Sequence, residues 1–453
     1  MTSVVTALSH RWEASVAAAL EPVPDITVVR RCADVAELVS VTAAGLGDSA
    51  VVSADLRELD LAVVHSLRSR GVWVVGLHAP GDEADERRLR QLSVDVVLPV
   101  DASGLVLAAA VRDRSAVSTM PELDQPDDPA APARQEGEGE QGWQPAGHPR
   151  PRDDLDGTLD ALPLDEPVSG RLLAVWGPAG APGRTTVAVA LAAELASRGR
   201  SVLLVDADTY GGCIAQVLGL LDEAPGIAAA CRAAEHGEFD LVALARVAPE
   251  VTTGLRVLTG LPRADRWPEI RSAALERVLT VSRSLAHYVV IDCGFCLEDD
   301  EELSYDTQAP RRNEATLTSL AASDEALVVG GADPVALQRF VRGMQELGTV
   351  PSGTPRPIIN RVRASAVGAD PRARIAASLE RFAGLSAVHF VPDDPAAADG
   401  SLLAGRSVVE HAPDSALRRA IADLASSIAP STARRAVRRA PRRLRRPLDR
   451  ARE

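Results

Sequence analysis

A glycine-rich turn between two apolar stretches carries the clearest chemistry in the chain. Residues 172–176 predict a buried strand, and residues 187–197 predict a helix that ends before Gly199; residues 176–187 read WGPAGAPGRTTV. A strand, a glycine turn and a helix in this order form a phosphate cradle. The glycines let the backbone approach an anion, free N–H groups point at it, and the helix dipole favours negative charge. The turn therefore predicts a nucleotide ligand.

The residues that close this turn match a triphosphate site. In such loops a cation reaches the β- and γ-phosphates, and the next hydroxyl holds Mg²⁺. Arg184 and Thr185 occupy these two places. The predicted nucleotide-binding residues of the turn are Gly180, Ala181, Gly183, Arg184, Thr185 and Thr186.

A dinucleotide site is the alternative interpretation. Three glycines in residues 177–183 have the spacing G-x-x-G-x-x-G, and Asp206 follows a predicted strand at 201–205, where an acid would bind a ribose. The Arg-Thr-Thr cluster and a second acid, Asp208, favour a triphosphate with Mg²⁺, because a dinucleotide needs neither.

A carboxylate at the end of a later strand supports the metal. The apolar stretch 288–292 predicts a strand that ends in Asp292. An acid at this position bonds the water shell of the nucleotide's Mg²⁺. The predicted metal site therefore comprises Thr185, Asp206 and Asp292.

Strands alternate with helices along the same part of the chain. Strands are predicted at 325–330 and 356–360, and helices at 335–347 and 371–382. The pattern predicts an α/β fold with a doubly wound, mostly parallel sheet and ligands at the carboxyl ends of its strands. Asn360 ends a strand at that edge. We expect it to contact adenine; the alternative is a polar turn residue without a ligand.

These motifs resemble the MinD/ParA deviant-Walker ATPases, and within them the CpaE/TadZ-like pilus-assembly branch, which carries a receiver-like domain ahead of the ATPase. The resemblance covers about residues 171–428 and is carried by GAPGRTT at 180–186, VDAD at 205–208, VID at 290–292, INR at 359–361, VPDDP at 391–395, GRSVV at 405–409 and APDS at 412–415. For the branch it is carried by GLRVLTGLP at 254–262.

The resemblance implies the cofactors ATP and Mg²⁺, an ATP-dependent homodimer, and slow hydrolysis coupled to the positioning of a membrane-associated assembly such as a pilus or secretion machine. It assigns catalytic roles to Arg184, as the cation on the phosphates, and to Asp208, which would orient the attacking water. Asp206 and Asp292 would act through the metal.

The chain departs from the family pattern in its loop. Ala179 stands where these ATPases have a lysine that reaches into the partner subunit's site, and Arg184 replaces the loop lysine with a longer planar group. Pro182 removes one backbone N–H from the cradle. The chain contains no lysine, so all 49 cationic residues are arginine. We expect Mg-ATP binding, and slow hydrolysis is favoured over a non-hydrolysing, ATP-bound scaffold.

Residues 1–114 predict a separate α/β domain. Five apolar strands, at 3–8, 26–29, 50–54, 72–76 and 95–99, alternate with helices, and Asp55 follows the third strand as the phospho-acceptor of a receiver does. The first strand is followed by Ser-His-Arg rather than an acidic pair, and Val100 stands where a receiver has lysine. Without a metal site, phosphoryl transfer loses its main support. We expect a degenerate receiver-like domain that serves docking.

Two charged segments complete the predicted organisation. Residues 115–170 are an acidic, proline-rich linker, which we expect to be disordered because it holds few apolar residues. Residues 431–453 are a basic tail with ten arginines and two acids. Residues 171–430 form the ATPase domain between them. The tail suits an anionic lipid surface. Nucleic acid and no partner at all are the alternatives, and DNA is disfavoured because the body is acidic.

Composition fixes the expected compartment. The chain has 453 residues, and its five cysteines indicate a reducing environment. It shows no signal peptide and no apolar run of about 18 residues, so we expect a cytoplasmic protein, peripheral to the inner membrane face at most. The C-x-x-C at 293–296 has no partner pair for zinc, and incidental thiols are favoured. The alternative function is a partitioning or septum-site ATPase that binds nonspecific DNA.

Overall fold

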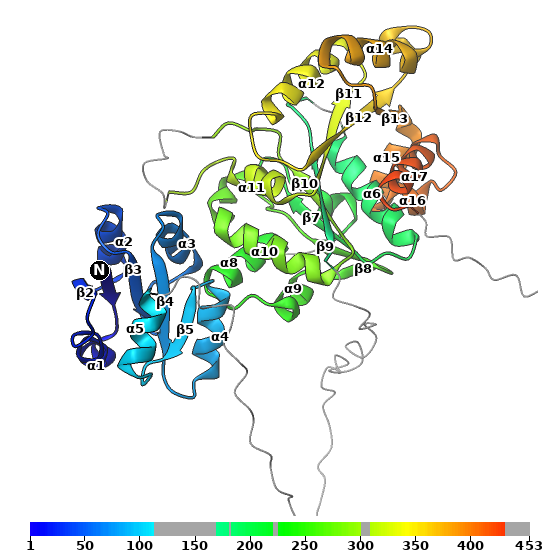
Figure 1. The fold of residues 1–453 in the computed structure, drawn as a ribbon. Helices are drawn as coiled ribbons and strands as arrows, with labels where there is room; N and C mark the ends of the chain where they lie inside the picture. The colour runs from blue at the N-terminus through cyan, green and yellow to red at the C-terminus, as the bar shows by residue number, and fades with distance from the viewer. Residues whose placement is uncertain (113–168, 181–182, 221–224, 300–308, 431–453) are drawn as a thin grey trace, which may run out of the picture.

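The computed structural model describes residues 1–112, 169–180, 183–220, 225–299 and 309–430. The predicted linker, apart from its last two residues, and the basic tail lie outside the described residues, as do Ala181 and Pro182. The described residues form two α/β units (Figure 1).

The first unit is a five-stranded parallel sheet with helices on both faces. Its strand order is β2-β1-β3-β4-β5, the flavodoxin-like form of a doubly wound sheet. The elements are β1 Thr2–Ala7, α1 His10–Leu20, β2 Ile26–Cys32, α2 Val35–Ala43, β3 Ser49–Ser53, α3 Leu61–Ser69, β4 Trp73–His78, α4 Glu83–Gln91, β5 Val96–Pro99 and α5 Gly104–Arg112.

Alternating side chains of these strands feed two cores. In β1, Val5 packs into the core beneath α2 and α3, whereas its neighbour Val4 packs into the core beneath α1 and α5. Successive residues of a strand point to opposite faces, so a strand buried on both sides is a continuous apolar run. This is why inner strands such as β1 and β3 were recognisable in the sequence.

The second unit has an eight-stranded sheet in the order β13-β12-β11-β6-β10-β7-β9-β8, in which only the edge pair β8–β9 is antiparallel. The strands are β6 Arg171–Trp176, β7 Val202–Ala207, β8 Glu250–Thr252, β9 Leu255–Leu258, β10 Tyr288–Cys293, β11 Glu325–Gly331, β12 Thr354–Val362 and β13 His389–Pro392. The predicted fold class is confirmed: two mostly parallel, doubly wound α/β sheets, the smaller one first.

Helices cover both faces of this sheet. They are α6 Arg184–Ser197, α7 Ile214–Val217, α8 Gly226–Glu235, α9 Leu241–Val247, the 3₁₀ helix η2 Ala264–Glu269, α10 Ser272–Leu285, α11 Glu314–Ala322, α12 Pro334–Leu347, α13 Ala364–Val367, α14 Pro371–Ala383, α15 Pro395–Ala404, α16 Val408–His411 and α17 Ala416–Ile428. α6 and α17 share one core with Leu173 and Val175 of β6, and α8, α10 and α12 share the other with Leu172 and Trp176.

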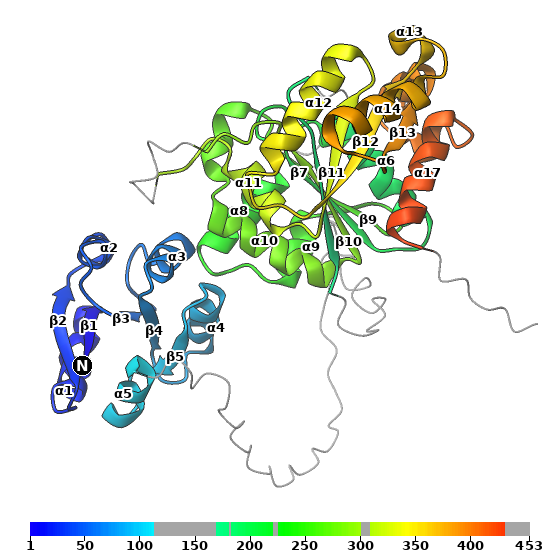
Figure 2. The same cartoon turned by 45° about the horizontal axis from the view of Figure 1, so that its top comes forward.

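The two units touch through α3 and α4 of the first and α8 and α10 of the second. Both views show α3 beside α8 (Figures 1 and 2). Arg88 of α4 donates from Nη1 to the carbonyl of Ala54 and from Nη2 to that of Leu59, each at 2.7 Å, and from Nε to the carbonyl of His236 at 3.1 Å. Ala273 of α10 packs against the core of the first unit. Among the described helices, none is both long and apolar enough to cross a membrane.

Candidate functional site

The turn between β6 and α6 needs glycine at its last position. Gly183 has φ +87° and immediately precedes α6, whose first residue is Arg184. A Cβ at Gly183 would run into the side-chain amide of Asn360, at the end of β12. The positive φ and the close contact both exclude larger residues. The turn therefore brings backbone N–H groups and the helix N-terminus to the carboxyl edge of the sheet, where an anion can bind.

The parallel register of β7 and β10 sets Asp206 directly opposite Asp292. The hydroxyl of Thr185 donates to Oδ2 of Asp292 at 2.6 Å. The other oxygen of Asp292, Oδ1, is buried and has no hydrogen-bond partner among the described residues. Asp206 accepts the backbone N–H of Ile214 at 3.0 Å. The three predicted metal residues are therefore assembled at one place.

Burial makes this carboxylate pair costly to ionise without a cation. Removal from water raises the pKa of Asp206 to about 7, and the charge of Asp208 adds to that effect. The pKa of Asp292 is raised by its burial and by the nearby charge of Asp206. The unpartnered Oδ1 and these two raised pKa values fit a bound divalent cation, whose charge would offset both.

No group of three or more His, Cys, Asp or Glu side chains in the described part of the chain is arranged to hold a metal by itself.

Arg184 is turned toward the carboxyl edge. Its guanidinium donates from Nη1 to the carbonyl of Gly177 at 3.0 Å and from Nη2 to Oδ2 of Asp208 at 3.4 Å. Its Nε is buried without a partner among the described residues. The two predicted catalytic residues are thus an ion pair, and the guanidinium keeps further N–H donors, including that of Nε, for an anion.

The loop after Asp208 is held by its own backbone and by an aromatic cluster. Oδ1 of Asp208 accepts the N–H groups of Tyr210 at 2.9 Å and Gly211 at 3.2 Å. The ring of Tyr210 lies 4.8 Å from that of Phe295, centroid to centroid, and the guanidinium of Arg312 lies 3.7 Å over it. The loops that follow β7 and β10 are therefore in contact.

A cavity of about 590 Å³ opens beside the start of α6. Of the predicted residues, Gly183, Arg184, Thr185, Thr186 and Asp208 line it. Asp206 and Asp292 are 2% and 1% exposed and do not line it. Asn360 lines a neighbouring cavity of about 400 Å³, which shares Gly183 and Thr186 with the first.

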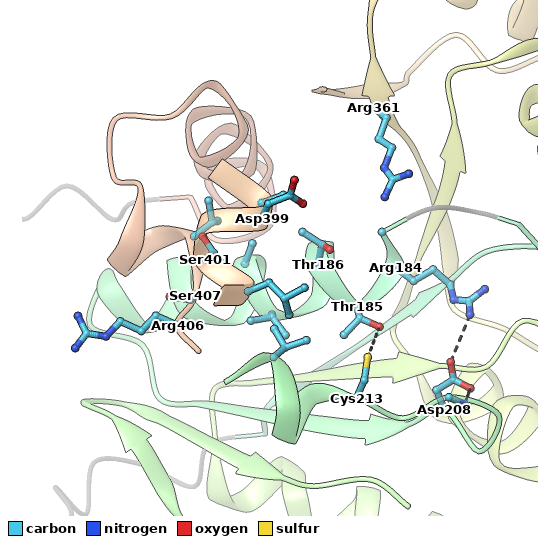
Figure 3. A pocket seen from close by; sticks show the side chains of 18 of the residues that line it. Arg184, Thr185, Thr186, Asp208, Cys213, Arg361, Asp399, Ser401, Arg406 and Ser407 are labelled. Atoms are coloured by element: carbon cyan, nitrogen blue, oxygen red, sulfur yellow. Dashed lines mark hydrogen bonds and ion pairs between the residues drawn. The ribbon is translucent and has the colours of Figure 1, made fainter. Parts of the chain in front are cut away.

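The other wall of the larger cavity was not predicted from the sequence. It comprises Asp399 and Ser401 of α15, Arg406 and Ser407 before α16, and Arg361 after Asn360. Figure 3 shows the side chain of Arg361 pointing toward the start of α6, whereas Arg406 points away. The S-x-x-E pattern at Ser407 and Glu410 is a capping box, which marks the start of α16. It is the one signal in the sequence that could have indicated a structured segment here.

The structure also shows the surroundings of Asp55 and of the C-x-x-C cysteines. Asp55 forms an ion pair with Arg11, Nε to Oδ2, at 3.0 Å. A fixed arginine thus stands beside the carboxylate, and the absence of phosphorylation stays a prediction. Cys293 and Cys296 are free thiols, and burial raises the pKa of Cys293.

No protein-family model matches the chain, and no curated protein matches it. Solved structures do. The cell division ATPase MinD of Pyrococcus furiosus is 22% identical, with 57% of this chain and 98% of that chain covered and a TM-score of 0.46. A ParA family ATPase from Chlorobium tepidum TLS is 20% identical, with 57% and 98% covered and a TM-score of 0.49. The septum site-determining protein MinD of Pyrococcus horikoshii OT3, complexed with Mg-ADP, is 20% identical, with 58% and 96% covered and a TM-score of 0.46.

Proposed function

We propose that the chain is a nucleotide switch of the MinD/ParA type that binds Mg-ATP and hydrolyses it slowly. The observation that carries the proposal is the hydrogen bond of Thr185 to Asp292 at 2.6 Å, beside a glycine turn and a helix N-terminus. The other carboxylate oxygen of Asp292 is buried and has no hydrogen-bond partner among the described residues. Thr185 and Asp292, with Asp206 beside them, would hold Mg²⁺, and the metal would neutralise phosphate charge.

Different residues would bind the phosphates, orient the attacking water and contact the base and sugar. Backbone N–H groups beside Gly183 and the guanidinium of Arg184 bind the phosphates. Asp208 orients the attacking water once Arg184 has turned from it to the nucleotide. Asn360, which lines the smaller cavity, and Arg361, which lines both cavities, would contact the base and sugar.

Breaking the Arg184–Asp208 ion pair would change the loop that follows β7. That loop contacts Phe295 and Arg312 through Tyr210, so the segments after β7 and β10 would respond as one. We propose that this response controls homodimerisation and partner docking. The finer proposal is that the partner belongs to a membrane-associated assembly such as a pilus machine, which the basic composition of residues 431–453 favours.

Titration with a fluorescent ATP analogue, in Mg²⁺ and in EDTA, tests the proposal. We expect binding that is tighter in Mg²⁺, and we expect Asp292→Asn to lose most of the Mg²⁺-dependent gain. Asp423→Asn, an exposed carboxylate on α17, is the matched control and should bind as the wild type does. Absence of binding in Mg²⁺ by the wild-type protein would refute the proposal.

A further inference from the structure

The phosphate-binding turn carries one cation, which is already engaged. Within residues 177–186 the charged residue is Arg184, and its guanidinium bonds Gly177 and Asp208. A triphosphate keeps negative charge after one Mg²⁺ is bound, and sites for it commonly place further cations on the terminal phosphate. A site of the proposed function would therefore need a second cation from outside the turn.

Helix α12 packs directly on this turn. It begins at Pro334 because the side chain of Asp333 accepts the N–H groups of Val335 and Ala336. One turn from its end, a Cβ on the buried Gly343 would lie 3.0 Å from the ring of Pro178. The absence of a side chain at 343 thus lets the helix approach the turn closely.

The residue four positions before Gly343 lies on the same face of the helix. That residue is Arg339, and its Nη1 is the atom that a Cβ on Gly180 would meet first. Gly180 has φ +76°, which favours glycine. Arg339 forms no hydrogen bond or ion pair with the residues that the structure describes, so its charge is available to a ligand.

The position of Arg339 selects the part of the nucleotide that it would reach. Asn360 and Arg361 line the smaller cavity together with Gly183, and in the proposed function they contact the base and sugar. The guanidinium of Arg184 reaches back to Gly177, at the opposite end of the turn. In that arrangement the terminal phosphate would lie next to Arg184. Arg339 lines neither cavity, but its Nη1 reaches the turn at Gly180, so it would approach the terminal phosphate from the side of α12.

We infer that Arg339 of α12 is the second cation of this site and binds the terminal phosphate of a nucleoside triphosphate. The inference rests on the proposed function. It assigns a binding role to a helix outside the motif, and it makes ATP and ADP distinguishable, since only the triphosphate reaches Arg339.

The test compares the affinities of Mg-ATP and Mg-ADP for the full-length protein by competition against the fluorescent analogue. Arg339→Ala is expected to weaken Mg-ATP by about tenfold or more, the usual loss for one charge-assisted hydrogen bond, and Mg-ADP by less than about twofold. Arg342→Ala is the matched control, because Arg342 is exposed on α12 and lines the groove toward α14 instead of the turn. It should leave both affinities unchanged.

A second substitution separates lost charge from lost packing. Arg339→Lys keeps a positive charge at the same place on α12, so it should retain most of the Mg-ATP affinity that Arg339→Ala loses. The inference is overturned if Arg339→Ala binds Mg-ATP as the wild type does, or if it weakens ATP and ADP equally. Failure of the wild-type protein to bind Mg-ATP would instead refute the proposed function.

Discussion

Arg184 sits where the nucleotide's phosphates would draw a cation, yet in the described structure it is paired with Asp208 and Gly177. Its Nε, buried without a partner among the described residues, is the part of the guanidinium that an anion would satisfy. A phosphate ligand would require the positive charge of Arg184, whereas the shape of its guanidinium serves the pairing with Asp208. These two requirements can be separated by substitution.

Arg184→Lys keeps the charge and is expected to bind Mg-ATP within about threefold of the wild type, whereas Arg184→Ala should bind about ten- to a hundredfold more weakly. Titration with the fluorescent analogue measures both, and circular dichroism checks that each variant folds. An Arg184→Ala protein with wild-type affinity would show that the cation does not contact the phosphates.

The sequence allowed the proximity of Thr185 and Asp292 to be predicted, but not that of Arg184 and Asp208. Thr185 lies in the first turn of the helix after β6 and Asp292 lies near the carboxyl end of β10, so both stand at one edge of a parallel sheet. The ion pair of Arg184 with Asp208 could not be predicted, since a long side chain without its ligand takes whichever acceptor is near. Arg361 lines the cavity and has φ +55°, a backbone conformation that non-glycine residues seldom adopt. Its neighbours in the sequence do not predict this conformation.

Helix α6, which follows the turn, is buried from Val187 to Ala196, including the charged Glu194 at 2% exposure. Two arginines neutralise it: Arg198, one turn on, and Arg418 of α17, each with Nε at 2.9 Å. The sequence predicted a helix at 187–197 from its apolar content. The identity of the helix that covers it was not predictable, because Glu194 and Arg418 are 224 positions apart.

Arg418→Ala should lower the free energy of unfolding by about 1–3 kcal/mol, because Glu194 stays buried with one of its two cations removed. Arg419→Ala, exposed on the same helix, should change it by less than about 0.5 kcal/mol. Urea denaturation of the two variants makes the comparison. Equal stabilities would mean that Arg198 alone satisfies Glu194 and that α17 is held by its apolar face.

The order of the two α/β units was evident from the alternation of apolar strands, but their contact was not, because interface residues such as Arg88 and His236 carry no pattern of their own. The contact rests on a close approach of two backbones. Gly237, two residues after the end of α8, has φ +72°, and a Cβ there would lie 2.9 Å from the carbonyl oxygen of Arg88 and 3.0 Å from Cγ of Leu92. A side chain at 237 is therefore incompatible with the observed docking.

Gly199 provides a matched control for that position. It too follows a helix, has φ +77°, and has nothing within 4 Å of its would-be Cβ. Both alanine substitutions should lose about 1 kcal/mol of unfolding free energy to the left-handed backbone. Only Gly237→Ala should also push α4 away from α8, which we expect as a larger radius of gyration in small-angle X-ray scattering and faster hydrogen exchange in α3 and α4. Identical scattering from the two variants would show that the docking of the two units does not depend on this contact.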